Sequence, residues 1–345
     1  MTNTEEKTDP LFNLEAYNYS LPKELIAQYP STKRDESRLL CYKKDNDTTT
    51  HHVFYDLPNL LGNNDVLILN NTKVIPARFY GLTENNKEIE LLLVRAIGLD
   101  SLVWKILGSP KKHLEKAKSL IINSNITIQV LDSETIRFSK YEDLEFILQN
   151  TGQMPLPPYI KRESESLDIE RYQTVFAKEL GAVAAPTASL HFTEDLLNKI
   201  RANGTEILFI TLHVGPGTFL PIRTIDIREH KLIPESFYIE LETWGKILEA
   251  KKNNKRIIAC GTTTVRTLEY AALINKYSGM TSLYITPGFE FKIVDGLITN
   301  FHLPKSTLLV LLSSLIGWKN VKALYEEAIK ENYRFYSYGD AMMAL

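Results

Sequence analysis

Residues 256–274, RIIACGTTTVRTLEYAALI, indicate the fold class because they join a strand to a helix through a short loop of hydroxyl-bearing residues. RIIAC predicts a strand and VRTLEYAALI a helix. The same alternation continues on both sides. A helix is expected near 243–253, and the strand LITNF is followed by an apolar helix at 305–316. Strands that alternate with helices predict an α/β layer with a mostly parallel sheet.

The segment from about Asp65 to Phe138 has a different pattern. Its apolar stretches are short and rich in β-branched residues, and turn signals such as TENNK and NSN separate them. This spacing predicts a small barrel or sandwich. We therefore expect an α/β main domain with a mixed, mostly parallel sheet from residues 1–62 and 150–345, interrupted by an inserted small β-barrel domain at 63–149. LPKELIAQYP, near the N-terminus, predicts a short helix of the main domain.

The composition narrows the class of protein. The chain has 345 residues and a formal net charge of −2, so any nucleic acid would have to bind to a local basic patch. Cys41 and Cys260 are far apart and in no CxxC pair, which argues against a disulfide scaffold or a zinc ribbon. The N-terminus lacks the apolar core of a signal peptide, and the strongest apolar run, 308–318, is shorter than the ~20 residues that cross a bilayer. We expect a cytoplasmic protein without membrane contact.

Three histidines have similar surroundings. His191 lies between the small residues of APTASL and a helix that Thr193 is expected to cap, while His213 and His302 follow strands. Ligands of α/β sheets bind beyond the carboxyl ends of the strands, so these loops could converge. Each histidine taken alone is better explained as a polar residue bonded to nearby backbone, but this explanation is weaker for all three together. No HExxH or HxxxH spacing is present, so no metal site is expected, and a zinc hydrolase is a minor alternative.

Two loops could bind a ligand through backbone groups. In CGTTTVRTLE, hydroxyl groups and Arg266 stand at the start of a helix, which suits a carboxylate or a phosphate. The alternative is a threonine cap with Arg266 paired to Glu269 or Tyr270 at the surface. HVGPGTF offers free N–H groups but lacks the third glycine of a dinucleotide fingerprint, and the chain has no Walker A loop and no GxSxG elbow.

Three segments combine cationic and aromatic residues, as RNA-binding surfaces do. They are NNTKVIPARF, PPYIKRE with ERYQ, and the C-terminal YRFYSYGDAMMAL. Docking of the C-terminal rings into the core is the alternative, above all for Phe335. The residues predicted to contact RNA are Lys73, Arg78, Lys161, Arg162, Arg171, Tyr172, Arg334 and Tyr336.

Together these stretches resemble one family, the S-adenosylmethionine:tRNA ribosyltransferase-isomerases of queuosine biosynthesis. The matching text includes NNTKVIPAR, GAVAAPTASLHFTEDLL, TLHVGPGTF, GTTTVRTLE, VDGLITNFHLPKSTLL and YRFYSYGDAM, in family order over almost the whole chain. The resemblance implies an α/β domain interrupted by a barrel. It also implies transfer and isomerisation of the ribosyl group of S-adenosylmethionine onto a tRNA wobble 7-aminomethyl-7-deazaguanine, which gives epoxyqueuosine-tRNA, adenine and methionine.

The reaction implied by the resemblance requires a base, because the sulfonium acidifies the neighbouring C5′–H. His191 is the first candidate, and His213, Glu235 and His302 are the others. The nucleophile is the amine of the tRNA base, so the enzyme needs none of its own. S-adenosylmethionine is consumed as a substrate, and no cofactor is expected.

The resemblance also suggests how S-adenosylmethionine is held. Arg266 with the loop Thr262, Thr263 and Thr264 would bind the methionine carboxylate, and Asp295 or Asp340 would balance the sulfonium charge. We expect a monomer. The alternative from another class is a non-catalytic tRNA-binding protein.

The chain departs from the family pattern at six positions, which weakens any essential role for the side chains that are absent there. His191, His213, His230, Glu235 and His302 are retained. The departures are Asn71, Lys73, Ser189, Pro216, Leu220 and Ile233.

Overall fold

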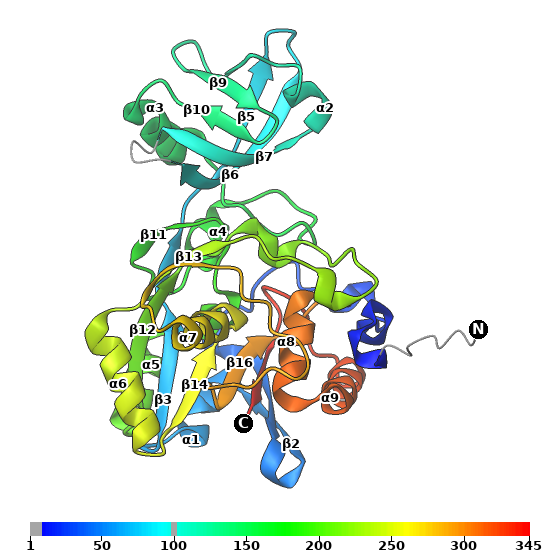
Figure 1. Cartoon of the computed structure of the whole chain (residues 1–345), viewed down its shortest axis with the longest axis vertical. Helices are drawn as coiled ribbons and strands as arrows, with labels where there is room; N and C mark the ends of the chain where they lie inside the picture. Colours follow the sequence, from blue (N-terminus) through cyan, green and yellow to red (C-terminus); the bar gives the residue numbers. More distant parts are fainter. Residues whose placement is uncertain (1–8, 98–101) are drawn as a thin grey trace, which may run out of the picture.

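The computed structural model describes residues 9–97 and 102–345. Within these residues the chain forms a nine-stranded sheet covered by helices, and a closed six-stranded barrel that stands apart from it (Figure 1). The expected α/β main domain with an inserted small barrel is confirmed.

The main sheet is mixed, with parallel pairing at its centre. The four inner strands β12, β3, β14 and β16 are parallel neighbours, β17 and β1 are also parallel, and the other neighbours are antiparallel. In spatial order the strands are β15 (Ser278–Thr281), β13 (Glu235–Tyr238), β12 (Glu206–Leu212), β3 (Asp65–Asn70), β14 (Arg256–Cys260), β16 (Gly296–Asn300), β17 (Ala341–Ala344), β1 (Arg38–Lys43) and β2 (Thr48–Val53).

Strand β3 corrects the expected domain boundary. The sequence pattern places it in the inserted domain, but it pairs with β12 and β14 at the centre of the main sheet. Every residue of β3 is buried, with Val66 and Ile68 in the core on one face and Leu67 and Leu69 in the core on the other. A continuous apolar run is typical of a parallel strand buried on both faces. After β3, β4 (Thr72–Val74) pairs with β11 (Glu179–Ala182).

The C-terminal strand β17 joins the N-terminal hairpin β1–β2 to the rest of the sheet. It pairs with β16 on one side and β1 on the other, and all four of its residues are buried. Phe335, just before it, is fully buried, which confirms the alternative reading in which the ring docks into the core. The last residues are therefore part of the core sheet rather than an RNA-binding tail.

Helices cover both faces of the sheet. Residues of α6, α7, α8 and α9 contribute to the larger core cluster, while α1 and α5 contribute to the cluster on the opposite face. Thr193 caps α5 as expected, since its hydroxyl accepts the Leu196 N–H at 3.1 Å. The bounds are α1 (Leu57–Leu60), α4 (Ser166–Arg171), α5 (Glu194–Ala202), α6 (Leu241–Lys252), α7 (Thr262–Ile274), α8 (Thr307–Ile316) and α9 (Trp318–Lys330).

One expected helix does not form. LPKELIAQYP has only a 3₁₀ turn at Lys23–Leu25, because Pro22 and Pro30 leave little room for a helix between them. Among the described residues no single helix is long and apolar enough to cross a membrane. The pair α8 and α9 meets that test only by length and composition, and is bent by 115° at its break.

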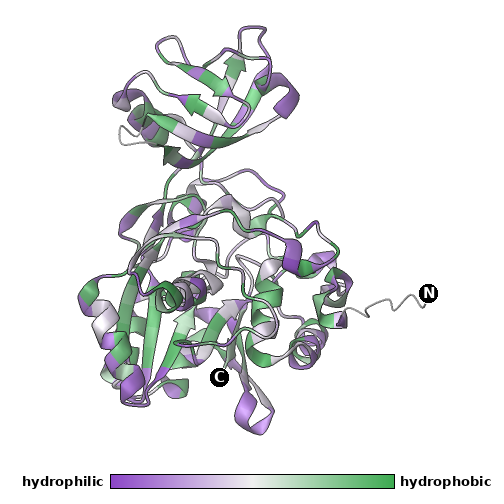
Figure 2. Ribbon diagram, in the orientation of Figure 1, coloured by the Kyte–Doolittle hydropathy of each residue, from purple (hydrophilic) through white to green (hydrophobic). Residues whose placement is uncertain are grey.

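The barrel has its own core. It includes Phe79, Leu91, Ile106 and Ile128, whereas the loops and α2 at its surface are hydrophilic (Figure 2). The barrel elements are β5 (Arg78–Thr83), β6 (Glu88–Ile97), β7 (Val103–Ser109), α2 (Lys111–Leu114), β8 (Ser119–Ile121), β9 (Thr127–Asp132), β10 (Thr135–Arg137) and α3 (Tyr141–Phe146).

Candidate active site

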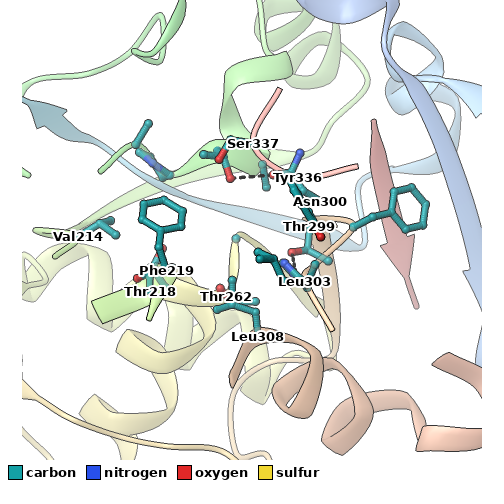
Figure 3. Close-up of a pocket in the computed structure, with 18 of the residues that line it drawn as sticks. Val214, Thr218, Phe219, Thr262, Thr299, Asn300, Leu303, Leu308, Tyr336 and Ser337 are labelled. Carbon is teal, nitrogen blue, oxygen red and sulfur yellow. Dashed lines mark hydrogen bonds between the residues drawn. The ribbon is translucent and has the colours of Figure 1, made fainter. Parts of the chain in front are cut away.

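A cavity lies at the carboxyl ends of the inner strands, where the sequence predicts that the loops converge. Val214 follows β12, Gly261 follows β14 and His302 follows β16, and all three line the cavity. Figure 3 shows Thr218 and Phe219 on one side and Thr299 and Asn300 on the other. The lining residues are Tyr159, Ala185, Pro186, Thr187, Ala188, Val214, Thr218, Phe219, Gly261, Thr262, Thr263, Thr299, Asn300, Phe301, His302, Leu303, Leu308, Tyr336 and Ser337.

The start of α7 brings backbone and hydroxyl groups to the cavity. Gly261 has φ +89°, a conformation that glycine adopts without strain, and it turns the chain from β14 into the helix. Thr262 and Thr263 line the cavity. Thr264 does not, because its hydroxyl donates to the Cys260 carbonyl at 2.6 Å. The first turn of α7 therefore presents N–H groups and two hydroxyls to a ligand.

Arg266 points away from this cavity. Its Nη1 donates to Glu235 Oε2 at 2.6 Å and its Nε donates to the Leu283 carbonyl at 2.9 Å. Glu235 Oε1 accepts the Gly215 N–H at 2.8 Å. Arg266 thus forms a buried ion pair that holds the loop next to the cavity, and its buried Nη2 has no hydrogen-bond partner among the described residues. The surface pairing with Glu269 is wrong, because Glu269 is buried and accepts N–H groups of 292–294.

His302 is the only one of the four candidate bases that lines the cavity. Its Nε2 lies 2.9 Å from Thr299 Oγ1, and its peptide N–H donates to the Tyr325 hydroxyl at 2.9 Å. Among the described residues no hydrogen bond reaches its Nδ1. Burial lowers the pKa of His302 to about 3, so the ring is neutral at pH 7.

His191 lies behind the cavity. Its Nδ1 is 2.9 Å from Ser37 Oγ, and its Nε2 accepts the Asn300 amide at 3.2 Å. The amide NH₂ can only donate, so the imidazole proton is on Nδ1. Burial, with the nearby Arg334, lowers the pKa of His191 to about 3. Both ring nitrogens are occupied, so this side chain orients Asn300 and does not itself face the cavity.

His213 and Glu235 line a neighbouring cleft between the two domains. Barrel residues Arg95 and Trp104 form its other wall. His213 Nδ1 lies 2.8 Å from Thr72 Oγ1, and burial lowers its pKa. The structure therefore separates the four candidate bases into one that faces the cavity, one behind it and two in the cleft.

Neither aspartate is placed to balance a cation in the cavity. Asp295 accepts the Ile257 N–H at 2.8 Å and pairs with Lys251 at 2.7 Å, at the opposite end of β14 from the cavity. Asp340 is buried and accepts the backbone N–H groups of Arg38 and Arg334 at 3.0 and 2.8 Å. Both carboxylates stabilise the fold.

Three of the residues predicted to contact RNA are structural. Arg162 forms a bidentate pair with the buried Asp168 at 2.7 and 2.8 Å. Arg171 donates to the carbonyls of Thr32 and Ser31 at 3.1 and 2.8 Å. Tyr172 is fully buried and cannot stack on a base.

Of the other residues predicted to contact RNA, some are exposed to solvent and the rest contact other parts of the protein or line the cavity. Lys73 and Lys161 are exposed. Arg78 donates to the Leu156 carbonyl at 3.0 Å, and Arg334 lies 3.6 Å from Asp340. Tyr336 lines the cavity.

Several residues that line the cavity were not predicted from the sequence. Asn300 donates to His191 and accepts the Thr187 hydroxyl at 2.8 Å, so its amide orientation is fixed. Phe219 follows the GPG loop, and Tyr159 lies in the segment interpreted as an RNA contact. Their positions within long motifs were the available signal, but which side chain faces inward depends on the tertiary fold.

The six departures from the family pattern lie outside the cavity lining. Ser189 donates to Cys260 Sγ at 3.3 Å in the core, and Asn71 accepts the Thr211 hydroxyl at 2.7 Å. Pro216 and Leu220 border a groove against the barrel, Ile233 lines the interdomain cleft, and Lys73 is exposed. No group of three or more His, Cys, Asp or Glu residues in the described part of the chain could hold a metal ion.

The fold and the cavity define an α/β protein that carries an inserted barrel and has a cavity beyond the ends of its inner strands, where proteins of this class bind their ligands. The chain belongs to the queuosine biosynthesis protein family, whose model matches residues 14–344.

Relatives and a solved structure extend this relationship over nearly the whole chain. An S-adenosylmethionine:tRNA ribosyltransferase-isomerase from Sulfurihydrogenibium is 46% identical over 334 residues, covering 96% of this chain and 99% of the relative. One from Carboxydothermus hydrogenoformans is 46% identical over 340 residues, with the same coverage. The crystal structure of an S-adenosylmethionine tRNA ribosyltransferase from Thermotoga maritima is 34% identical with a TM-score of 0.56, covering 96% of this chain and all of that one.

Proposed function

We propose that this protein transfers and isomerises the ribosyl group of S-adenosylmethionine onto 7-aminomethyl-7-deazaguanine at the wobble position of tRNA. The products are epoxyqueuosine-tRNA, adenine and methionine. The observation that carries the proposal is the 46% identity, over 96% of the chain, to ribosyltransferase-isomerases. A non-catalytic tRNA-binding protein, the alternative from the sequence, gives no reason for a substrate cavity at the strand ends.

The cavity offers a site for the methionine carboxylate of S-adenosylmethionine. The first turn of α7 supplies N–H groups and the positive end of the helix dipole, and Thr262 and Thr263 add hydroxyl donors. Arg266 contributes indirectly, through Glu235 and the Gly215 N–H. Binding thus depends on backbone geometry rather than on a cationic side chain.

His302 is our candidate for the base that removes the C5′ proton. It faces the cavity, and its Nδ1 is free of hydrogen bonds among the described residues. Because burial lowers its pKa to about 3, the ring is neutral and able to accept a proton at pH 7. The low pKa also makes it a weak base, so the reaction depends on the sulfonium to acidify the C5′–H.

The tRNA contacts exposed cations such as Lys73 and Lys161. S-adenosylmethionine is consumed, and no metal or other cofactor takes part. The protein acts as a monomer in the cytoplasm, without membrane contact.

The test is to incubate the protein with S-adenosylmethionine and tRNA, and to measure free adenine. Adenine should appear in step with epoxyqueuosine, only with tRNA that carries the aminomethyl-deazaguanine, and EDTA should leave the rate unchanged. Equal release with unmodified tRNA, or no release at all, would refute the proposed function. Loss of activity in EDTA that zinc restores would refute the metal-free part alone.

A further inference from the structure

The cavity has no charged side chain among the described residues that line it. The substrate proposed above carries a sulfonium cation, and burying an unpaired cation is costly. Asp295 and Asp340, the two carboxylates considered for this role, bond to other groups outside the cavity. Some other feature of the cavity has to stabilise the positive charge.

Four aromatic rings line the cavity, those of Tyr159, Phe219, Phe301 and Tyr336, and Tyr159 contacts both Phe219 and Tyr336. The Tyr159 and Tyr336 ring centroids lie 4.6 Å apart, and the Tyr159 and Phe219 centroids lie 5.9 Å apart in an edge-to-face arrangement. They come from distant segments of the chain, so the fold assembles them. We call Tyr159, Phe219 and Tyr336 the aromatic wall.

The aromatic wall is held in place by its neighbours. The Tyr159 hydroxyl lies 2.5 Å from Ser337 Oγ, and this hydrogen bond anchors the outer end of the side chain. Tyr336 has φ +73°, in the left-handed region that costs a bulky residue free energy. Tyr336 nevertheless holds this conformation beside the cavity, as strained residues at ligand sites do.

We propose that the aromatic wall binds the sulfonium of S-adenosylmethionine by cation–π attraction. The electron-rich faces of tyrosine and phenylalanine attract a cation within about 6 Å, and the attraction is stronger where water is excluded. The rings take the place of the missing carboxylate, and they leave the charge on sulfur free to acidify the adjacent C5′–H. This inference rests on the proposed function, because it assigns the cavity to that substrate.

The experiment compares three ligands by calorimetry. S-adenosylmethionine and sinefungin are cationic at the sulfur position, whereas S-adenosylhomocysteine has the same adenosine and amino acid groups but a neutral thioether. The wild-type protein should prefer both cations over the thioether by about two- to thirty-fold. Replacing Phe219 with mono-, di- and trifluorophenylalanine should lower this preference stepwise and leave thioether affinity unchanged, since fluorine withdraws electrons from the ring face without removing it.

The control is Leu303→Ala, which changes a cavity-lining residue that has no ring. This variant should lower the affinity for the two cations and the affinity for the thioether by the same factor. A preference that does not respond to fluorination overturns the cation–π role. If fluorination lowers the affinity for all three ligands in parallel, the cation–π role is also overturned, and the rings are assigned to stacking on adenine. Failure of the wild type to bind any of the three refutes the proposed function itself.

Discussion

His191 and His302 are both buried and neutral near pH 7, but their surroundings give them different roles. Asn300 and Ser37 occupy the two ring nitrogens of His191. His302 has one ring nitrogen bonded to Thr299, and it faces the cavity. The base preferred from the sequence is therefore less well placed than the third histidine of the set.

We expect His302→Asn to lower kcat by about 10²–10⁴ while the KM for S-adenosylmethionine changes little, because a general base acts in the chemical step. The measurement is steady-state adenine release with modified tRNA. His191→Asn is the matched control and should lower thermal stability more than turnover. If His302→Asn retains wild-type kcat, the base is elsewhere, and the same substitution at His213 is the next test.

Acid should destabilise the protein before its carboxylates titrate. Burial lowers the pKa of His191 and of His302 to about 3, below the unfolded value near 6.5. The unfolded chain therefore takes up protons first, and stability falls as pH drops from 6.5 towards 3. The loss between pH 7 and pH 5 is about 2 kcal/mol for each histidine.

Urea unfolding at pH 7 and pH 5 measures this loss. In His191→Asn the drop should be smaller than in the wild type by about 2 kcal/mol. An identical drop in both proteins would mean that His191 is accessible to protons in the folded state.

Among the elements of the main domain, α4 is linked by hydrogen bonds to the N-terminal segment around Gln28 and to the C-terminal turn that contains Tyr338. Burial would raise the pKa of Asp168, but hydrogen bonds from Arg162, the Glu165 N–H and Tyr338 outweigh burial and hold it below its usual value. Arg162 also donates to the Gln28 carbonyl at 3.1 Å. One buried carboxylate thus links three segments that are distant in the sequence.

Arg162→Ala should lower the free energy of unfolding by about 3 kcal/mol, because it leaves Asp168 buried without its charged partner. Lys161→Ala, at the exposed neighbouring position, should change it by less than about 0.5 kcal/mol. Chemical unfolding of both variants checks this. Equal stabilities would mean that solvent reaches Asp168 and replaces the arginine.

The loop after β12 depends on the buried pair of Arg266 and Glu235. Arg266→Met should lower the free energy of unfolding by about 3–5 kcal/mol, because it leaves the buried Glu235 carboxylate without its cationic partner. Adding Glu235→Gln removes that charge and keeps an acceptor for the Gly215 N–H, so the double variant should recover much of the loss. The measurement is a double-mutant cycle, in which the free energies of unfolding of the two single variants and the double variant are compared with that of the wild type. Additive losses would exclude an energetic coupling between Arg266 and Glu235.

For the molecule as a whole, a net charge of −2 leaves tRNA binding to local cations. Several arginines expected at the interface are used within the fold, while Lys73 and Lys161 are exposed. Replacing both lysines with alanine should weaken tRNA binding. It should also reduce the slope of log K against log salt by about 1 for each phosphate that the variant no longer neutralises.

The control for this prediction replaces Lys199 and Lys246, which lie on α5 and α6. Filter binding at several salt concentrations compares the two double variants. The same change in slope for both would show a general effect of charge rather than a local tRNA contact.

Local sequence alone is enough to predict the type and order of most elements. The β14–α7 unit, the Thr193 cap of α5, the apolar helix α8 and the inserted barrel follow from periodicity and turn chemistry. The long motifs, and the order in which they occur along the chain, are likewise enough to predict the family. These features are encoded within short windows of residues, so they can be recognised without knowing what packs against them.

The partners that these elements meet are defined only in the folded chain. β3 lies in the main sheet rather than the barrel, and β17 pairs with β1 across about 300 residues of sequence. Arg162 pairs with the buried Asp168, and His302 rather than His191 faces the cavity. The physical reason is that a periodic pattern shows which residues are apolar but not which distant surface covers them. Burial, hydrogen bonding and pKa therefore depend on contacts that form only when the chain is folded.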